Sequence, residues 1–415
     1  MTDLLPVRRV GFLFNHEQVH QIAHSAPIAF ELSRSYREFA VVLLFSSEKQ
    51  RAALETLARA YPGHRCEFLA LRAEGRFAWL EGAPKTFALL RNLALLRTNA
   101  QTFSGFDAIV TPEKTSLAIR NLAGCAGLKL VHTRHGAGDR EIGFDAQSRE
   151  FDLVLLPGEK IRRRLAAAGA LAPQHAIVGY AKFDVGATPA ANRRKLFDDD
   201  KPTVLYNPHC SPHLSSWYAQ GREILDFFRA SGRYNLIFAP HVMLFQRRLQ
   251  VSIDKLAFKW VRNLESKYLA SDNIHVDLGS SACTDMTYTR AADLYLGDVS
   301  SQVCEFLLNP RPCVFVNTHR IRWRDDPNYS AWSLGSVFER VEELPGALES
   351  AFRGHAEFRG AQEAYVRDTF DLSETPSAQR AAEAIRGFLA QAPQLAGRGE
   401  RFEPAGRIAE RSFHG

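Results

Sequence analysis

Short apolar runs alternate with longer amphipathic segments along most of the chain, which is the pattern of a parallel-sheet α/β protein. In the first half, runs rich in Val, Ile, Leu and Phe predict strands at 10–15, 40–45, 66–71, 107–111, 128–133, 152–157 and 175–180. Amphipathic segments predict helices near 20–37, 48–60, 77–99 and 159–168. We therefore expect a first β/α domain over residues 1–185.

The pattern restarts after a stretch of Pro, Asn and charged residues at 186–201, which we interpret as a linker. Strands are predicted at 202–208, 234–240, 273–278, 292–298 and 312–317, and helices near 215–230, 242–269, 300–308, 340–353, 357–371 and 376–391. These elements predict a second β/α domain over 202–392. The polar, Gly-rich segment 393–415 is expected to be disordered.

The composition indicates the kind of ligand and the cell compartment, but it does not identify a partner. The 415 residues include 52 Lys and Arg against 46 Asp and Glu, and this +6 balance favours anionic ligands. The basic residues are dispersed, so nucleic acid is not an expected partner. Six scattered cysteines without a C-x-x-C pair indicate reduced thiols, and no apolar run is long enough for a signal peptide or a membrane span. We expect a cytoplasmic protein.

Parallel sheets bind ligands at the carboxyl ends of their strands, and several predicted strands end in histidine. The run at 128–133 leads into His135 and Gly136, and the glycine permits a tight turn. The runs at 202–208 and 234–240 lead into His209 and His241. An imidazole can pair with a diphosphate or act as a base, whereas each histidine alone is also consistent with a solvated loop. Zinc is not favoured, because no carboxylate or thiol is at ligand spacing.

The segment at 292–309 suits a phosphate group. A predicted strand ends at Asp298, and Ser300 and Ser301 stand where the next helix begins. We expect all three among the residues that bind the donor phosphates. Hydroxyls and free backbone N–H groups at such a position bind anions, although a plain N-cap is the alternative. Glu305 lies one turn further, where it either accepts hydrogen bonds from a ribose or is solvated.

Residues 76–98 form a basic amphipathic pattern with a single acidic residue, Glu81. Such a helix either lies on an anionic membrane surface or forms the core face of a domain. A peripheral contact with the inner face of the cell membrane through this segment is therefore one of two interpretations.

The order of these motifs over about residues 130–320 resembles the CDP-glycerol glycerophosphotransferases, which polymerise teichoic-acid and capsule backbones. The matching elements are the His-Gly loop at 135–136, Gly179-Tyr180-Ala181-Lys182-Phe183-Asp184, Leu205-Tyr206-Asn207-Pro208, Pro240-His241 and Gly297-Asp298-Val299-Ser300-Ser301. This chain differs in having Val299 where the family has tyrosine, Glu305 where it has aspartate, Asn207-Pro208-His209-Cys210 where it has Ala-Pro-Thr-Trp, and Ala181-Lys182 where it has Pro-Arg.

The resemblance implies a GT-B-like architecture, two Rossmann-like domains facing a cleft. His135 would then be the catalytic base, His241 a second essential histidine near the donor phosphates, and Ser300 and Ser301 the diphosphate ligands. Lys182 would stabilise the leaving nucleotide, and no metal cofactor would be needed. The implied partners are a nucleotide-activated donor and a glycan or lipid-linked acceptor held by the first domain.

Three other functions use the same architecture or a part of it. A sugar-nucleotide glycosyltransferase has the same two-domain architecture. So does a nucleotide-sugar 2-epimerase, which needs carboxylates around the sugar. Asp139, Glu141 and Asp145 are available for that role, or form a solvated polar turn. A non-catalytic nucleotide- or glycan-binding protein is the third alternative.

Overall fold

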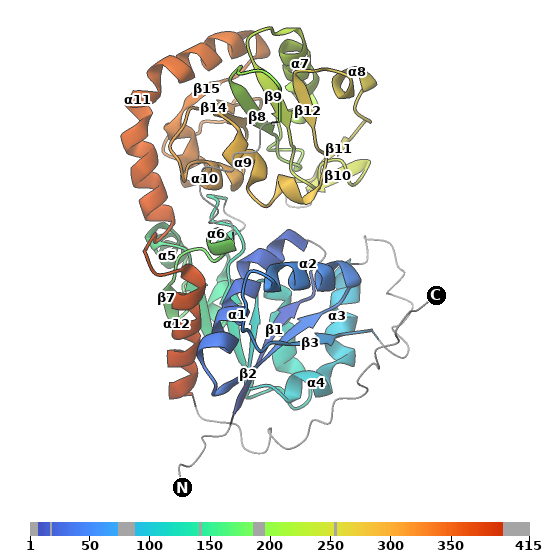
Figure 1. The fold of residues 1–415 in the computed structure, drawn as a ribbon, viewed down its shortest axis with the longest axis vertical. Coiled ribbons are helices and arrows are strands. Elements are labelled where there is room, and N and C mark those ends of the chain that lie inside the picture. The colour runs from blue at the N-terminus through green and yellow to red at the C-terminus, as the bar shows by residue number, and fades with distance from the viewer. Residues whose placement is uncertain are drawn as a thin grey trace.

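The computed structural model describes residues 7–16, 19–73, 88–140, 143–185, 196–252 and 255–392. The chain forms two lobes stacked along the long axis of the molecule, each built around one parallel sheet (Figure 1). The predicted tail at 393–415 and most of the predicted linker, 186–195, lie outside the described residues. The domain boundaries remain a prediction.

The first sheet has seven strands in the order β3-β2-β1-β4-β5-β6-β7, with all neighbours parallel. The strands are β1 (Arg8–Phe14), β2 (Phe39–Phe45), β3 (Glu67–Ala70), β4 (Ala108–Thr111), β5 (Lys129–Thr133), β6 (Leu153–Leu156) and β7 (His175–Ile177). Phe12 and Phe14 pack into the core on one face, and Leu13 packs into the core on the other. Burial on both faces explains the continuous apolar runs in the sequence.

Helices cover both of those faces. They are α1 (Ala26–Ser35), α2 (Glu48–Ala58), α3 (Ala88–Thr98), α4 (Ala100–Ser104), α5 (Glu159–Ala167) and α6 (Lys182–Val185), with 3-10 helices η1 (Val19–His24), η4 (Lys114–Asn121) and η6 (Ala146–Glu150). Ser47 caps α2 by accepting a hydrogen bond from the Gln50 N–H, and the Gln50 side chain accepts one from the Ser46 N–H. This reciprocal capping fixes the start of the helix directly after β2.

The second sheet has six parallel strands in the order β12-β9-β8-β13-β14-β15. They are β8 (Thr203–Asn207), β9 (Asn235–Phe238), β12 (Ile274–Val276), β13 (Leu294–Gly297), β14 (Cys313–Val316) and β15 (Ser336–Phe338). The helices of this half of the chain are α7 (Trp217–Ala230), α8 (Ser266–Leu269), α9 (Thr287–Ala291), α10 (Gln302–Phe306) and α11 (Leu344–Thr369), with 3-10 helices η8 (Ser281–Cys283), η9 (Pro327–Leu334) and η10 (Val341–Glu343), and the last helix of the chain is α12 (Ser377–Gln391). The edge strand β15 was not among the predicted strands.

The predicted helix at 242–269 is wrong. This stretch contains an antiparallel hairpin of β10 (Leu249–Ser252) and β11 (Ala257–Trp260), followed only by the short α8. The apolar residues are numerous enough to suggest a helix, but their alternation at 249–252 has the period of a strand. The two helices predicted at 340–353 and 357–371 form one continuous helix, α11. Its packing outweighs the low helix propensity of Gly354 and Gly360.

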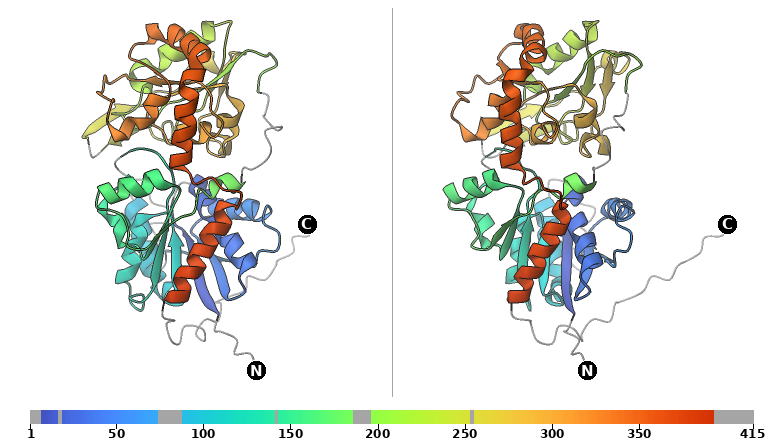
Figure 2. Two further views of the ribbon diagram at one scale, coloured as in Figure 1. Left: turned by 90° about the vertical axis from the view of Figure 1, so that its left-hand side faces the viewer. Right: turned by 60° about the vertical axis from the view of Figure 1, so that its left-hand side comes forward.

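The long helix α11 connects the two lobes along one side of the molecule (Figure 2). Asp368 near its end forms an ion pair with Arg163 of α5 at 2.6 Å. The chain then crosses to the first lobe, where α12 packs against α1 and adds Ala381, Ile385 and Leu389 to the core of the first sheet. The second predicted domain included this helix, which instead packs on the first sheet.

Among the described residues, none of the helices has both the length and the apolar character needed to cross a bilayer. Within the basic segment 76–98, residues 76–87 are outside the described part of the chain. In the described part, Leu95 and Leu96 of α3 are buried in the core, as the domain-helix interpretation expects.

Candidate functional site

The strand orders place a switch point in each sheet, between β1 and β4 in the first and between β8 and β13 in the second. Crossovers leave these points in opposite directions, so the loops after the strands open a space for a ligand. In the second lobe these loops carry His209 and Ser300. In the first lobe they carry His16 and Glu113, with His135 following the adjacent strand β5.

The His-Gly loop of the first lobe lies directly against the serine loop of the second. A Cβ atom added to Gly138 would be 3.2 Å from the Ser301 Cβ, and one added to Gly136 would be 4.0 Å from the Ser301 hydroxyl. Gly136 has a φ of +93°, which favours glycine, and its N–H donates to the Tyr180 hydroxyl at 3.0 Å. The structure therefore brings together two motifs that the sequence separates by more than 160 residues.

The His135 ring is held in one tautomer. Its Nδ1 lies 2.9 Å from the Pro112 carbonyl oxygen. A carbonyl only accepts, so Nδ1 carries the proton and Nε2 keeps a free lone pair. Burial lowers the pKa of His135, with a smaller opposing contribution from the hydrogen bond to Pro112, although the residue as a whole keeps an exposed surface. The neutral ring at pH 7 thus presents Nε2 as a base.

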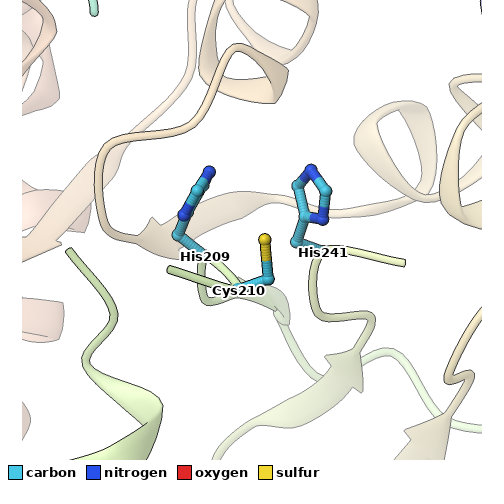
Figure 3. Close-up of side chains that lie close together, drawn as sticks. All are labelled: His209, Cys210 and His241. Carbon is cyan, nitrogen blue, oxygen red and sulfur yellow. The ribbon is translucent and has the colours of Figure 1, made fainter. Parts of the chain in front are cut away.

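His209 and His241 occupy equivalent positions after β8 and β9, and each follows a proline (Figure 3). The His209 Nδ1 accepts the Ser211 N–H at 2.9 Å, and the His241 Nδ1 accepts the Met243 N–H at 3.3 Å. The neutral rings must therefore carry their proton on Nε2. These two imidazoles are N–H donors, the opposite of His135.

The surroundings keep both of these rings neutral. Burial lowers the pKa of His241 to about 4, and it lowers the pKa of His209 well below its usual value. The positive charge of Arg140, from the loop of the first lobe, lowers both further. Two neutral N–H donors beside a guanidinium suit an anion such as a phosphate.

Cys210 lies between the two histidines, and the ligand atoms of the three side chains are within 4.8 Å of one another. The expectation that no thiol is at ligand spacing was therefore wrong. The donor set nevertheless does not fit a zinc ion in this arrangement. Both Nδ1 atoms already accept backbone N–H groups and both Nε2 atoms carry protons, so neither neutral ring has a lone pair free for a metal. Burial raises the pKa of the Cys210 thiol, which keeps it protonated. Arg140 adds positive charge nearby, which disfavours a cation.

Ser300 and Ser301 directly precede the five-residue helix α10, with Ser301 as its N-cap residue. The Ser300 hydroxyl accepts the Gln302 N–H at 3.2 Å, and Ser301 is exposed toward the His-Gly loop. Because α10 is so short, its dipole adds little, and the hydroxyls are the main groups offered to a ligand.

Asp298 is placed differently from its predicted role. It is 1% exposed and accepts the backbone N–H groups of His209 at 2.8 Å and Ser216 at 3.1 Å. Burial raises the pKa of this carboxyl to about 7 despite those bonds. Asp298 therefore positions the loop that carries His209.

Lys182 and Glu305 pair with each other across the two lobes. The Lys182 Nζ lies 2.5 Å from a Glu305 carboxylate oxygen, and both side chains are buried. In the same motif, Asp184 accepts the backbone N–H groups of Ser377 and Ala378 and so caps α12. The 179–184 element thus joins the first lobe to α10 and to α12.

Comparison with solved structures identifies the architecture. The chain has a GT-B-like fold. It is similar to the wall teichoic acid polymerase TagF, with a TM-score of 0.58 and 12% identity over 93% of this chain and 90% of that one. It is also similar to a putative UDP-N-acetylglucosamine 2-epimerase from Listeria monocytogenes, with a TM-score of 0.61 and 13% identity over 94% of this chain and 99% of that one.

A third similar structure is the UDP-GlcNAc 2-epimerase from Neisseria meningitidis bound to UDP-GlcNAc, with a TM-score of 0.55 and 11% identity over 93% of this chain and 100% of that one. No protein-family model matches the chain, and no curated protein matches it. The predicted GT-B-like architecture is confirmed. The similarity extends to transferases and epimerases alike, so it does not choose between their activities.

Three histidines in the first lobe of this GT-B-like fold were not among the predicted site residues. His16, His20 and His24 follow β1 at intervals of four residues, and η1 carries the last two. Burial lowers the pKa of His20 to about 3, and the charges of Lys182, His241, His16 and His135 lower it further. Groups from both lobes thus contribute to the electrostatic environment of His20. The regular spacing of the three was a visible signal.

Asp139 is not part of a solvated turn, which corrects one of the expectations above. It is buried, forms an ion pair with Lys160 at 2.8 Å, and accepts hydrogen bonds from Ser330 and Tyr365 of the second lobe. Asp145 pairs with Lys114 at 2.6 Å, and Glu141 lies outside the described residues. Asp139 is thus a structural connection between the GT-B lobes.

The first lobe also has a cavity of about 400 Å³ at the ends of β1, β2 and β3. Asn15, Gln50, Arg72, Arg91 and Leu95 are among its lining residues. Asn15 is 2% exposed, and neither its amide oxygen nor its amide nitrogen has a hydrogen-bond partner. The cavity gives the first lobe room for a polar group close to His16, on the lobe where an acceptor was expected.

Proposed function

We propose that this protein is a transferase that moves glycerol phosphate from a nucleotide-diphosphate donor such as CDP-glycerol to a lipid-linked or polymeric glycan acceptor. The observation that carries the proposal is the opposite tautomers of the histidines. His135 offers a lone pair, whereas His209 and His241 offer N–H groups. A base on one lobe and anion donors on the other are what phosphoryl transfer between bound partners requires.

In the proposed reaction, His135 Nε2 takes the proton of the acceptor hydroxyl. The hydroxyl oxygen then attacks the phosphorus that carries glycerol, and the P–O bond to the leaving CMP breaks. Charge grows on the leaving phosphate, where the Nε2–H groups of His209 and His241 and the guanidinium of Arg140 stabilise it. Ser300 and Ser301 hold the diphosphate through their hydroxyls.

The Glu305–Lys182 pair modifies the roles first expected of these two residues. Glu305 was expected near the ribose and Lys182 near the leaving nucleotide. Each is already the other's partner at 2.5 Å. We propose that the pair orients α10, and with it Ser300 and Ser301, and that it contacts the donor only if donor binding separates the two charges.

A nucleotide-sugar enzyme, either a glycosyltransferase or a 2-epimerase, is the second candidate. Glu113 favours it, because this carboxyl follows β4 beside the His135 loop, accepts a hydrogen bond from Gln21, and has a pKa raised by burial. A half-buried acid of this kind can exchange a sugar proton. Asp139 and Asp145 count against it, because ion pairs already engage both carboxylates.

The deciding experiment incubates the full chain with CDP-glycerol, UDP-GlcNAc or UDP-glucose, and separates the products by anion-exchange chromatography. The proposal predicts CMP release from CDP-glycerol that increases with acceptor. Release of UDP, or conversion of UDP-GlcNAc to its 2-epimer, would favour the second candidate. A nucleotide-dependent rise in melting temperature without any product would indicate a binding protein.

A further inference from the structure

The β10–β11 hairpin exposes its apolar side chains to solvent and turns its polar side chains toward the protein. Its register pairs Leu249 with Trp260 and Val251 with Phe258. These side chains are on the outer face, with Val251, Phe258 and Trp260 between 56% and 67% exposed. The inward-facing Gln250 and Ser252 are each only 6% exposed. A shift of one residue in β10 would exchange the two faces, so the register specifically exposes the apolar one.

Hydrogen bonds fix this register. The Gln250 side chain donates to the carbonyl oxygens of Met243 and Leu244, and the Ser252 hydroxyl lies 3.0 Å from the His213 Nδ1. Polar anchoring on the inner face leaves the apolar pairs exposed in the part of the chain that the structure describes. A two-stranded hairpin is only marginally stable in water, and exposed apolar patches of this kind mark interaction sites.

Cations surround the exposed pairs. Residues 243–264 contain one acidic residue, Asp254, and five basic residues, which are Arg247, Arg248, Lys255, Lys259 and Arg262. All five basic side chains are exposed, and Leu256 beside them is 87% exposed. Lys259 pairs with Gln250 and so lies on the inner face, which leaves four cations available to the outer face. Tryptophan and phenylalanine flanked by Lys and Arg have the composition of an interfacial membrane anchor. The charge complements an anionic lipid surface.

We propose that the outer face of the β10–β11 hairpin docks the second lobe onto an anionic membrane surface. The apolar pairs would enter the headgroup region, and Arg247, Arg248, Lys255 and Arg262 would lie among the lipid phosphates. The Ser252–His213 contact joins the hairpin to the loop that begins at His209, so docking would bring the histidine pair close to the lipid surface. A lipid-linked acceptor would then meet the site where it is anchored.

The test is cosedimentation of the full chain with vesicles of phosphatidylcholine alone or mixed with phosphatidylglycerol. Wild-type protein should bind the mixed vesicles and lose binding as salt is raised. The double variant Phe258→Ser/Trp260→Ser should bind them about tenfold more weakly. Leu372→Ser is the matched control, because Leu372 is 53% exposed on a different part of the molecule.

A second pair of variants tests the charge. Arg247→Gln/Arg248→Gln should weaken binding about tenfold, whereas Arg37→Gln/Lys49→Gln, on the first lobe, should not. Unchanged melting temperatures establish that each variant is folded. Three results would overturn the proposal: no wild-type binding to anionic vesicles, equal binding by the hairpin variants, or a wild-type dimer that these variants convert to monomers. CMP release with a water-soluble acceptor is measured in parallel, so that failure of the proposed function is recognised separately.

Discussion

The ring centroids of His209 and His241 lie 5.1 Å apart with the ring planes tilted by 51°, and each ring accepts a backbone N–H on Nδ1. The two strands that precede them, β8 and β9, are neighbours in the sheet, and each ends in a Pro-His turn with the same hydrogen bond. The turn thus assigns the same tautomer to both rings. His135, bonded to a carbonyl instead of an N–H, has the other tautomer.

The close approach of the two lobes at Gly138 should be sensitive to a single methyl group. Gly138→Ala would place a Cβ 3.2 Å from the Ser301 Cβ, which forces Ser301 or the loop to shift. We expect a several-fold rise in KM for the donor and a loss of stability of about 1 kcal/mol. Steady-state kinetics and thermal melts check both. Gly346→Ala, in α11 with nothing within 4 Å of the new Cβ, is the control and should not raise KM.

The buried Lys182–Glu305 pair should matter most when only one charge is removed. Lys182→Met leaves Glu305 without a partner and should destabilise the protein by about 3–5 kcal/mol. Glu305→Gln should be milder, because the amide still accepts a hydrogen bond from Lys182. The double variant Lys182→Met/Glu305→Leu should recover much of the lost stability, as judged by thermal melts. A double variant as unstable as the sum of its parts would show that the pair does not act as a unit.

Divalent metal should be dispensable for turnover. The Nδ1 atoms of His209 and His241 are occupied and the Cys210 thiol is protonated, so chelation of metal by EDTA should leave CMP release unchanged. Cys210→Ser should also retain activity within about twofold, because the thiol has no part in the proposed reaction. Stoichiometric zinc in the purified protein, lost in Cys210→Ser together with activity, would contradict this.

Much of the fold was predictable, because strands that are buried on both faces have continuous apolar sequences. Phe12, Leu13 and Phe14 are one example, since both faces of β1 must be apolar. The hairpin was not predictable in the same way. Its apolar residues face outward, so the usual inference from hydrophobicity to core failed there. The return of α12 to the first lobe depends on the cap from Asp184, a long-range contact that local sequence does not reveal.

The candidate site was predictable in its parts but not in its pairings. Histidines after strands were visible in the sequence, whereas their tautomers depend on backbone atoms such as the Pro112 carbonyl and the Ser211 N–H. Asp139 and Asp298 have the sequence positions of ligand-binding carboxylates, but both are buried and hold loops in place. The four-residue spacing of His16, His20 and His24 is visible in the sequence, although these residues were not predicted to belong to the site.

The pH dependence of kcat/KM should report the base. His135 must be neutral to accept a proton, and burial holds its pKa below the usual 6.5. The value of kcat/KM should therefore stay level from pH 8 down to about 6.5 and fall at lower pH, as the ring becomes protonated. A profile that declines already between pH 8 and pH 7 would indicate a different base.

Glutamine substitutions at His135 and at His241 test the assignment of the tautomers most directly. A glutamine amide can replace an Nε2–H donor but cannot act as a base. His241→Gln should keep donor affinity by calorimetry and most of the turnover, whereas His241→Ala should lose affinity. His135→Gln and His135→Ala should both bind the donor and lose about 10²- to 10⁴-fold in kcat. Substantial turnover by His135→Gln, or equal losses for the two His241 variants, would contradict the division of base and donor between the lobes.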